Sequence, residues 1–337
     1  MPGTIAILGA GAWGTALAVH LATRSGAHPR VILWARRREH AAEMNRAREN
    51  VRYLPEVRLP GSVEVTADPH VAARAELLFA APPIASLVAL ADEMREIGAE
   101  APLVWLSKGF VASGDLPAGF GLAHQILAKR WGRPVGVVSG PSFADEVARG
   151  LPTALTVAAT KRSLARDVAQ LLRGETLRAY ETDDLPGVEV GGAIKNVLAI
   201  AAGASDGLGF GDNARAALIT RGLAETGRLL EALGGRRESL MGLSGLGDLV
   251  LTCTGDLSRN RRVGLALSRG ENLGSTLAKL GHVAEGVAAA KAAHALAAHH
   301  ELDMPITDAV FRVLYENVSP RAAVEALLAR EPKPEME

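Results

Sequence analysis

Hydrophobic positions in the first half of the chain form short runs separated by longer amphipathic stretches. The runs occupy residues 4–9, 30–34, 76–81, 102–107 and 135–140, and several end at small residues. Between most of them lie segments with helical periodicity, such as 13–24 and 84–97. This alternation predicts βαβ units and a largely parallel sheet covered on both faces. Two more strands, at 154–159 and 177–182, flank a helix at 162–173 and can extend the sheet.

Strand patterns stop near residue 187, and the remaining chain is rich in Ala and Leu at helical spacing. We expect helices over 189–204, 212–233, 259–269, 283–300 and 304–316, separated by glycine loops. The sequence therefore predicts an α/β domain over residues 1–187 and an all-α domain over residues 188–330.

A glycine pattern directly follows the first expected strand. The segment "GAGAWG" places Gly9, Gly11 and Gly14 in the spacing G-x-G-x-x-G at the start of a helix. In this spacing the first glycine permits a tight turn, the second lets a pyrophosphate approach, and the third lets helix and strand pack closely. The context predicts a Rossmann-type dinucleotide site, and a glycine turn without a ligand is the alternative.

The end of the second strand bears on the choice of dinucleotide. An NAD site usually carries an acid about 20 residues after the glycines, to hold the ribose 2′-hydroxyl. Here "LWARRREH" has no acid before Glu39 and instead offers Arg36, Arg37 and Arg38. Arginine suits a 2′-phosphate, so NADPH is favoured over NADH without excluding it. The alternative is a solvated basic turn, which we expect for Arg38.

Composition places the chain among soluble globular proteins. It has 337 residues, of which 48% are hydrophobic and 22% charged, and acids and bases balance at 37 each. No global field therefore recruits nucleic acid or an anionic membrane. A single cysteine forms no intrachain disulfide, and neither a signal peptide nor an apolar run of membrane-spanning length is evident. We expect a cytoplasmic protein without membrane insertion.

One lysine stands in the most apolar neighbourhood of the chain. Lys195 lies within "GGAIKNVLAIAAG", which contains no acid. A buried lysine finds a partner or loses its proton, and a lowered lysine pKa suits an acid/base catalyst. Asp248 is placed among leucines and a valine, so it too is expected to be buried and to pair with Lys195. The alternative for Lys195 is a helix lysine that reaches out to solvent.

Three further segments carry candidate ligand-binding groups. Lys108 follows a strand end, where open α/β sheets bind ligands, although a lone lysine is usually only solvated. The loop "SGPSFADEVARG" presents Ser139, Gly140 and Ser142 before a helix starting at Ala144, and could equally be an ordinary turn.

The segment "SRNRR" supplies Ser258, Arg259 and Asn260 ahead of a helical stretch, a plausible cradle for phosphate or carboxylate. Arg261 and Arg262 are expected to be solvated. Cys253 is expected to be a small buried residue rather than a nucleophile, and the nine histidines show no metal-ligand spacing.

Together these segments resemble one enzyme family. "GAGAWGTALA", "SKG", "SGPSFADEVA", "GGAIKNVLAIAAG", "GLGDLVLTCT", "SRNRR" and "VAEGV" occur in the order found in bacterial NAD(P)-dependent glycerol-3-phosphate dehydrogenases. The resemblance runs from residue 5 to about 315 and is most specific between 187 and 262. It implies reversible hydride transfer between NAD(P)H and dihydroxyacetone phosphate, giving sn-glycerol 3-phosphate for phospholipid synthesis.

The resemblance also assigns roles to individual positions. It places the catalytic lysine on Lys195, and we expect Asp248 and Lys108 to be catalytic residues with it. The positions implied to contact substrate are Lys108, Gly140, Ser142, Lys195, Asn196, Asp248, Ser258, Arg259 and Asn260. The positions implied to contact cofactor are Gly9, Gly11, Ala12, Trp13, Gly14, Arg36, Arg37, Lys108, Ala144, Arg259, Val283 and Glu285. Family members often carry Ser at Ala12, so one hydroxyl contact is expected to be lost. We expect no metal and a homodimer.

Two other functions remain open at this stage. A ketopantoate-type or β-hydroxyacid reductase shares the two-domain plan and a catalytic lysine but takes a carboxylate substrate, which "SRNRR" disfavours. A non-catalytic NADPH-sensing subunit would keep the glycine loop but need neither Lys195 nor Asp248.

Overall fold

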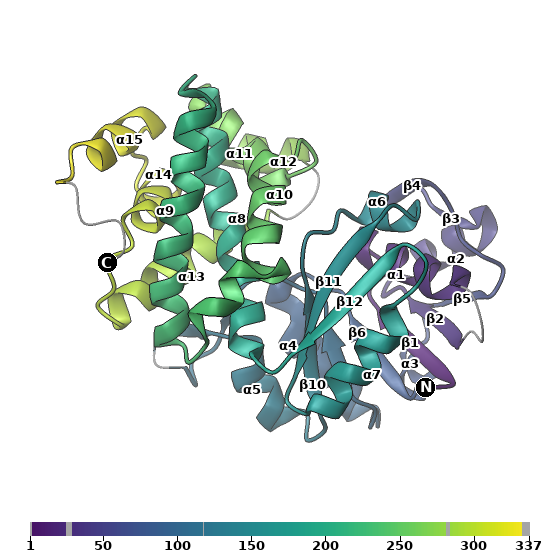
Figure 1. The fold of residues 1–337 in the computed structure, drawn as a ribbon. Coiled ribbons are helices and arrows are strands. Elements are labelled where there is room, and N and C mark those ends of the chain that lie inside the picture. Colours follow the sequence, from purple (N-terminus) through teal and green to yellow (C-terminus); the bar gives the residue numbers. More distant parts are fainter. Residues whose placement is uncertain (1, 25–28, 117, 281–283, 332–337) are drawn as a thin grey trace.

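The computed structural model describes residues 2–24, 29–116, 118–280 and 284–331. Figure 1 shows a sheet-containing half, built by the N-terminal part of the chain, beside a half made of helices. The longest helix, α8 (Leu185–Gly207), begins against the sheet and continues through the centre of the helical half. The predicted fold class, an α/β Rossmann-type part followed by an all-α part, is confirmed.

The central sheet has eight strands in the order β12-β11-β10-β7-β6-β1-β2-β5. The strands are β1 (Thr4–Leu8), β2 (Arg30–Trp34), β5 (Val63–Thr66), β6 (Leu77–Ala80), β7 (Leu103–Trp105), β10 (Val135–Ser139), β11 (Thr153–Ala159) and β12 (Leu177–Thr182). All neighbours pair in parallel except β10 and β11, which are antiparallel. β1 lies between β2 and β6, so the order in which the chain adds strands reverses at β1. Open α/β sheets bind ligands at the carboxyl ends of the strands at such a reversal.

Helices cover both faces of this sheet, as the apolar strand runs predict. Ile5 and Ile7 of β1 belong to the buried cluster on one face, which includes residues of α1 (Ala12–Thr23), α2 (Arg38–Ala47) and α7 (Arg162–Leu172). Ala6 and Leu8 belong to the cluster on the opposite face, which includes residues of α3 (Pro69–Ala73), α4 (Leu87–Glu96) and α5 (Ala123–Arg130). A strand buried on both faces needs apolar residues at every position, which is why β1 shows no alternation.

Several short elements lack a corresponding sequence prediction. They are β5 and the two-stranded pairs of β3 (Glu49–Asn50) with β4 (Leu54–Arg58) and β8 (Val111–Ala112) with β9 (Phe120–Gly121). β5 is an edge strand whose Val63 and Val65 are buried while Glu64 and Thr66 are partly exposed. Four alternating residues form no apolar run, so the pattern that reveals the inner strands misses this one.

The helical half contains more helices than the periodicity indicates. They are α8, α9 (Gly211–Ala232), α10 (Asp248–Thr254), α11 (Arg259–Ser268), α12 (Leu273–Leu280), α13 (Glu285–His299), α14 (Pro305–Tyr315) and α15 (Pro320–Leu328). The prediction missed α10, α12 and α15, which are short. It also started α8 at 189, whereas the Asp184 side chain accepts a hydrogen bond from the Gly187 amide at 3.0 Å and caps the helix at Leu185.

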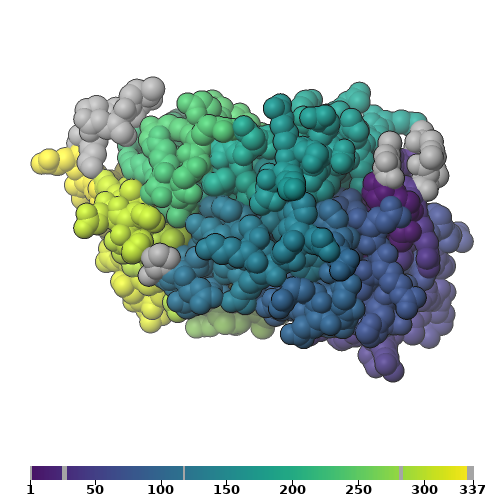
Figure 2. All heavy atoms as spheres, turned by 90° about the horizontal axis from the view of Figure 1, so that it is seen from below, coloured from purple at the N-terminus to yellow at the C-terminus, as the bar shows by residue number. Residues whose placement is uncertain are grey.

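By length and composition alone, α8 would suffice to cross a membrane, but 89% of its apolar window is buried inside the protein. α9, α10, α11, α13 and α14 surround it. On the face seen in Figure 2 the green and yellow residues of the helical half and the blue residues of the N-terminal half form one continuous surface. α8 is therefore the core helix on which the second half is assembled.

Candidate active site

The glycine loop connects β1 to α1, and each of its three glycines meets a different surrounding. Gly9 has a φ of +120°, and a Cβ on Gly14 would lie 2.0 Å from the Gly9 carbonyl oxygen. Both glycines are thus required by the turn itself. A Cβ on Gly11 would meet nothing within 4 Å. The open side of Gly11 is the space that a pyrophosphate needs, so the loop fits the predicted dinucleotide.

The start of α1 adds hydrogen-bond donors to this open side. Gly11 is the N-cap and makes no side-chain cap, and Ala12 is the first helical residue. The first amides of a helix have no partner within the helix and attract anions. The indole Nε1 of Trp13 donates to the Ser142 carbonyl at 3.1 Å, which joins this loop to the one after β10.

Arg36 and Arg37 follow β2 and are exposed, as a site for a 2′-phosphate requires. Arg36 lies 3.4 Å from the carboxylate of Glu93 on α4, and both side chains are solvent-accessible. Exposed pairs of this kind contribute about 0–1 kcal/mol, so the guanidinium remains free to bind a stronger anion.

Lys108, Asp248 and Lys195 meet between the two halves of the molecule. Asp248, the first residue of α10, is buried; its Oδ1 accepts from Lys195 Nζ at 2.5 Å and its Oδ2 from Lys108 Nζ at 2.6 Å. Lys108 Nζ also donates to the Gly140 carbonyl at 3.0 Å. The expected contact between Lys195 and Asp248 is present, and Lys108 shares the same carboxylate.

Two glycines preceding Lys195 explain how α8 reaches this place. A Cβ on Gly191 would lie 2.4 Å from the carbonyl oxygen of Ser244, in the short π-helix Leu243–Gly247 directly before α10. A Cβ on Gly192 would lie 2.9 Å from Ser139 Oγ and 3.4 Å from Lys108 Cγ. α8 therefore passes close to both α10 and the end of β10 only because these positions have no side chain.

Burial lowers the pKa of Lys195 to about 8. The negative charge of Asp248 opposes this shift, and the positive charge of Lys108 adds to it. A lysine that titrates near neutral pH donates and accepts a proton with similar ease, which suits general acid/base chemistry.

Thr252 is a member of this cluster that the sequence analysis missed. Lys195 Nζ donates to Thr252 Oγ1 at 3.0 Å, and that hydroxyl donates to the Asp248 carbonyl at 2.6 Å. Asp248 and Thr252 lie four residues apart on α10 and therefore share one helix face. That spacing was the available signal for Thr252 within "GLGDLVLTCT".

The loop after β10 packs against the same cluster. Gly140 has a φ of +136°, and its carbonyl oxygen accepts from both Lys108 and Ser142 Oγ, the latter at 3.0 Å. Ala144 is the first residue of α6 (Ala144–Ala148). Ser139 Oγ is buried without a hydrogen-bond partner in the described structure.

Ser258, Arg259 and Asn260 form the N-terminus of α11. Ser258 Oγ caps the helix by accepting from the Arg261 amide at 3.3 Å, and Arg259 is exposed. Asn260 Nδ2 donates to Asn196 Oδ1 at 2.9 Å. This helix start, with a cap and an arginine, is the type of site that holds a phosphate.

Gly286 and Glu285, at the start of α13, lie beside this helix start and connect it to other elements. Asn260 Oδ1 accepts from the Gly286 amide at 3.1 Å, and Glu285 Oε1 accepts from the Ile84 amide at 3.3 Å. Burial raises the pKa of Glu285, while the charges of Arg259, Lys195 and Lys108 oppose that shift. Val283 lies outside the described residues.

Two expectations about side-chain surroundings have clear outcomes. Cys253 is buried, which raises the pKa of its thiol to about 12, so it is no thiolate nucleophile at neutral pH. The expectation that Arg261 is solvated is wrong. Its guanidinium pairs with Asp206 at 2.8 Å and is 14% exposed, because α11 packs against the end of α8.

Comparison with known proteins agrees with these elements in order. A family model described as the N-terminus of NAD-dependent glycerol-3-phosphate dehydrogenase matches residues 4–165, and the C-terminal model matches residues 184–325. The chain is 53% identical over 336 residues to "Glycerol-3-phosphate dehydrogenase [NAD(P)+]" of Aromatoleum aromaticum, covering 98% of this chain and 99% of that protein.

A second relative of the same name, from Dechloromonas aromatica, is 51% identical over 336 residues and also covers 98% of this chain and 99% of that protein. The solved structure of glycerol-3-phosphate dehydrogenase from Coxiella burnetii superposes with a TM-score of 0.90 at 42% identity, covering 97% of this chain and 99% of that one. The chain therefore belongs to the NAD-dependent glycerol-3-phosphate dehydrogenase family.

Proposed function

We propose that Lys195 is the general acid/base of a reversible, NAD(P)H-dependent reduction of dihydroxyacetone phosphate to sn-glycerol 3-phosphate, which supplies glycerophospholipid synthesis. One observation carries the assignment. A buried lysine with a pKa of about 8 contacts Asp248 between the open glycine loop and the start of α11.

The chemistry divides between cofactor and protein. The bound nicotinamide supplies or accepts the hydride at the carbonyl carbon. During reduction Lys195 donates its proton to the carbonyl oxygen, and during oxidation it takes the proton back from the alcohol. Asp248 orients the Lys195 ammonium group through the 2.5 Å contact and keeps its pKa from falling further.

We assign the remaining substrate contacts to groups around this pair. Lys108 and Asn196 hold the reacting end of the substrate, and the loop with Gly140 and Ser142 borders it. Ser258, Arg259 and Asn260 hold the phosphate at the start of α11. A phosphate held in this way contributes binding energy that orients a very small reacting group.

The cofactor positions follow the same logic. The pyrophosphate binds the backbone amides of Gly11, Ala12, Trp13 and Gly14. Arg36 and Arg37 bind the 2′-phosphate and so favour NADPH. Gly9 shapes the turn.

Lys108, Ala144, Arg259, Val283 and Glu285 complete the proposed cofactor set. In this assignment residues 1–187 form the cofactor domain and residues 188–330 the substrate domain.

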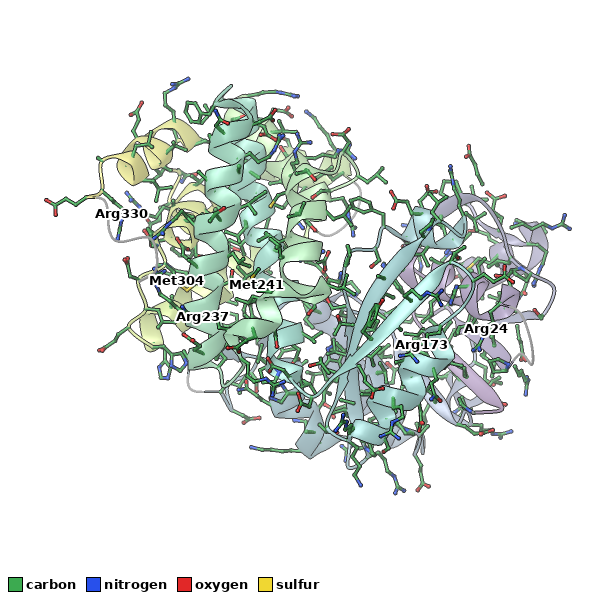
Figure 3. All side chains as sticks on the ribbon, viewed as in Figure 1. Arg24, Arg173, Arg237, Met241, Met304 and Arg330 are labelled. Atoms are coloured by element: carbon green, nitrogen blue, oxygen red, sulfur yellow. The ribbon has the colours of Figure 1, made fainter. Side chains whose placement is uncertain are left out.

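We also propose that the protein is a cytoplasmic homodimer that uses its helical half as the interface. Met241, labelled in Figure 3 on that half, is 69% exposed, and Leu257 is 56% exposed. Sedimentation velocity at micromolar protein tests the dimer, and a monomer would contradict it. Cell fractionation with the tagged protein tests the compartment.

The first test follows NADPH and NADH oxidation at 340 nm with dihydroxyacetone phosphate as the only substrate. We expect rapid oxidation that unphosphorylated dihydroxyacetone does not support, with NADPH preferred. If a carboxylate such as ketopantoate is reduced instead, the rival reductase is correct.

The second test replaces the lysine itself. Lys195→Ala is expected to lower kcat at least about a hundredfold while NADPH still binds, because only the proton donor is lost. Lys291→Ala changes an exposed lysine on α13 and serves as the matched control. Undiminished turnover by Lys195→Ala would show that the acid/base assignment is wrong.

A further inference from the structure

A buried asparagine outside the proposed site holds the glycine loop from behind. Asn50, in β3, is 0% exposed. Its Nδ2 donates to the Ala10 carbonyl at 3.0 Å and to Thr15 Oγ1 at 2.7 Å. The sequence analysis assigned no role to Asn50, because nothing in its local pattern marks it.

Thr15 extends this support to the next peptide group. Its Oγ1 accepts from Asn50 and donates to the Gly11 carbonyl at 2.8 Å. The Thr15 amide donates to the same carbonyl at 2.9 Å. Asn50 and Thr15 together therefore bind two consecutive carbonyl groups of the loop, those of Ala10 and Gly11.

The direction of these carbonyls decides where the loop amides point. In a trans peptide the C=O of one residue and the N–H of the next point in opposite directions. Holding the Ala10 carbonyl toward Asn50 therefore turns the Gly11 amide away from the protein interior. Holding the Gly11 carbonyl does the same for the Ala12 amide. Neither amide is then directed at Asn50 or Thr15, and the loop is open at Gly11, where an added Cβ would meet nothing within 4 Å.

His40 fixes which way round the Asn50 amide lies. His40 Nε2 lies 3.0 Å from Asn50 Oδ1. An amide oxygen only accepts, so Nε2 carries the proton and donates to it. With its oxygen occupied by His40, Asn50 presents its NH₂ group to the loop and both of its hydrogens are used.

We propose that Asn50 is a positioning residue for the cofactor pyrophosphate, acting directly on Ala10 and through Thr15 on Gly11. The inference rests on the proposed use of a dinucleotide at this loop. A residue acting in this way aligns donors before the ligand arrives, which lowers the ordering cost of binding. A purely structural role would instead show only in the stability of the fold.

The experiment measures binding to fragments of the cofactor, so that turnover is not needed. ADP carries a pyrophosphate, whereas adenosine 2′-monophosphate carries the adenosine and 2′-phosphate without one. We expect Asn50→Leu to weaken ADP binding at least about tenfold, the loss of about one charge-assisted hydrogen bond, and to leave the Kd of adenosine 2′-monophosphate within about twofold. Isothermal titration calorimetry on the full-length protein gives both constants.

A conservative pair keeps the test valid if Asn50→Leu does not fold. Thr15→Ser retains the hydroxyl and is expected to bind ADP within about twofold of the parent protein. Thr15→Val has nearly the same shape without the hydroxyl and is expected to bind ADP about fivefold more weakly.

Two results would overturn the inference. One is unchanged ADP affinity in Asn50→Leu or Thr15→Val; the other is an equal loss for both ligands, which a general structural effect would cause. Failure of the proposed reaction looks different, because the parent protein would then bind ADP yet leave dihydroxyacetone phosphate unreduced.

Discussion

Lys195 carries an ammonium group in the apolar interior of α8, and its surroundings set how readily it releases the proton. Desolvation is the largest influence and lowers the pKa to about 8, while Asp248 prevents a greater fall. Thr252 accepts a second hydrogen bond from the same nitrogen, so the direction of the ammonium group is fixed as well. Two neighbours on α10 thus orient the ammonium group, while burial, Asp248 and the Lys108 charge together set its proton affinity.

The pH dependence follows from this pKa. Reduction needs protonated Lys195, so kcat/KM for dihydroxyacetone phosphate is expected to fall about tenfold per pH unit above about pH 8. Oxidation of sn-glycerol 3-phosphate needs the neutral amine and is expected to rise with pH up to the same value. Initial rates in both directions between pH 6 and 10 measure this. Two profiles with the same slope would contradict the assignment.

The glycine loop allows a second prediction at single residues, since Gly11 and Gly14 differ in what surrounds them. Gly11→Ala is expected to leave stability within about 0.5 kcal/mol, because its φ of −81° suits any residue and its Cβ meets open space. NADPH binding is expected to weaken at least about tenfold, since the new methyl group occupies the ligand's space.

Gly14→Ala is the matched comparison. Its Cβ would lie 2.0 Å from the Gly9 carbonyl oxygen, so α1 must move away from β1, at a cost of about 3 kcal/mol. Urea unfolding of both variants and calorimetry with NADPH separate the two effects. Equal loss of stability in both would show that Gly11 is also a packing residue.

At the scale of elements, the site depends on how closely α8 approaches its neighbours. Gly191 and Gly192 let α8 contact the short π-helix before α10 and the end of β10. Further along, Gly203 of α8 and Gly264 of α11 face one another's helices, where Cβ atoms would lie 1.9 Å from the Arg261 carbonyl oxygen and 2.0 Å from the Ile200 carbonyl oxygen. Small residues at such a crossing let two helix backbones come into contact.

Gly203→Ala is therefore expected to separate α8 from α11. We expect a loss of about 3 kcal/mol of stability and a higher KM for dihydroxyacetone phosphate, because α11 begins with the proposed phosphate-binding residues. Gly61→Ala, where a Cβ would meet nothing within 4 Å, is the control and is expected to change neither value. An unchanged KM in folded Gly203→Ala protein would show that the contact between α8 and α11 does not affect substrate binding.

At the scale of the whole molecule, the buried charges join its two halves. Lys108 follows the sheet strand β7, whereas Asp248 and Lys195 belong to the helical half. Both lysines donate hydrogen bonds to the Asp248 carboxylate. Glu285 adds a contact from α13 to the Ile84 amide of the first half. The proposed catalytic centre therefore lies at the junction between the two halves.

Asp248→Ala tests this junction. It leaves the buried ammonium group of Lys195 and the partly buried one of Lys108 without their carboxylate, and we expect a loss of about 3 kcal/mol at pH 7. Without Asp248 the pKa of Lys195 in the folded state falls further below its unfolded value, so the variant gains stability as the pH rises through that interval. The deficit relative to the parent protein is thus expected to be smaller at pH 9 than at pH 7.

Urea midpoints at the two pH values measure this effect. Asp256→Ala, which removes a 98% exposed side chain, is the control. A deficit that stays constant between pH 7 and pH 9 would mean that the lysine charges do not limit the stability of the junction.

The sequence by itself determined the features that local chemistry dictates. Strands buried on both faces show as apolar runs, and the glycine spacing marks the turn after β1. A lysine and an aspartate among apolar residues predict a buried pair. The edge strand β5 and the short helices α10, α12 and α15 were not predicted. Each has too few residues to show a clear hydrophobic periodicity.

Only the tertiary structure decided which distant groups touch. It placed Lys108 on the second oxygen of Asp248, Thr252 on Lys195, and Asn50 behind the glycine loop. It also turned Arg261 from an expected solvated residue into a partner of Asp206. Such contacts join residues up to 140 positions apart, and their geometry depends on how closely helices and strands approach, which no local pattern records.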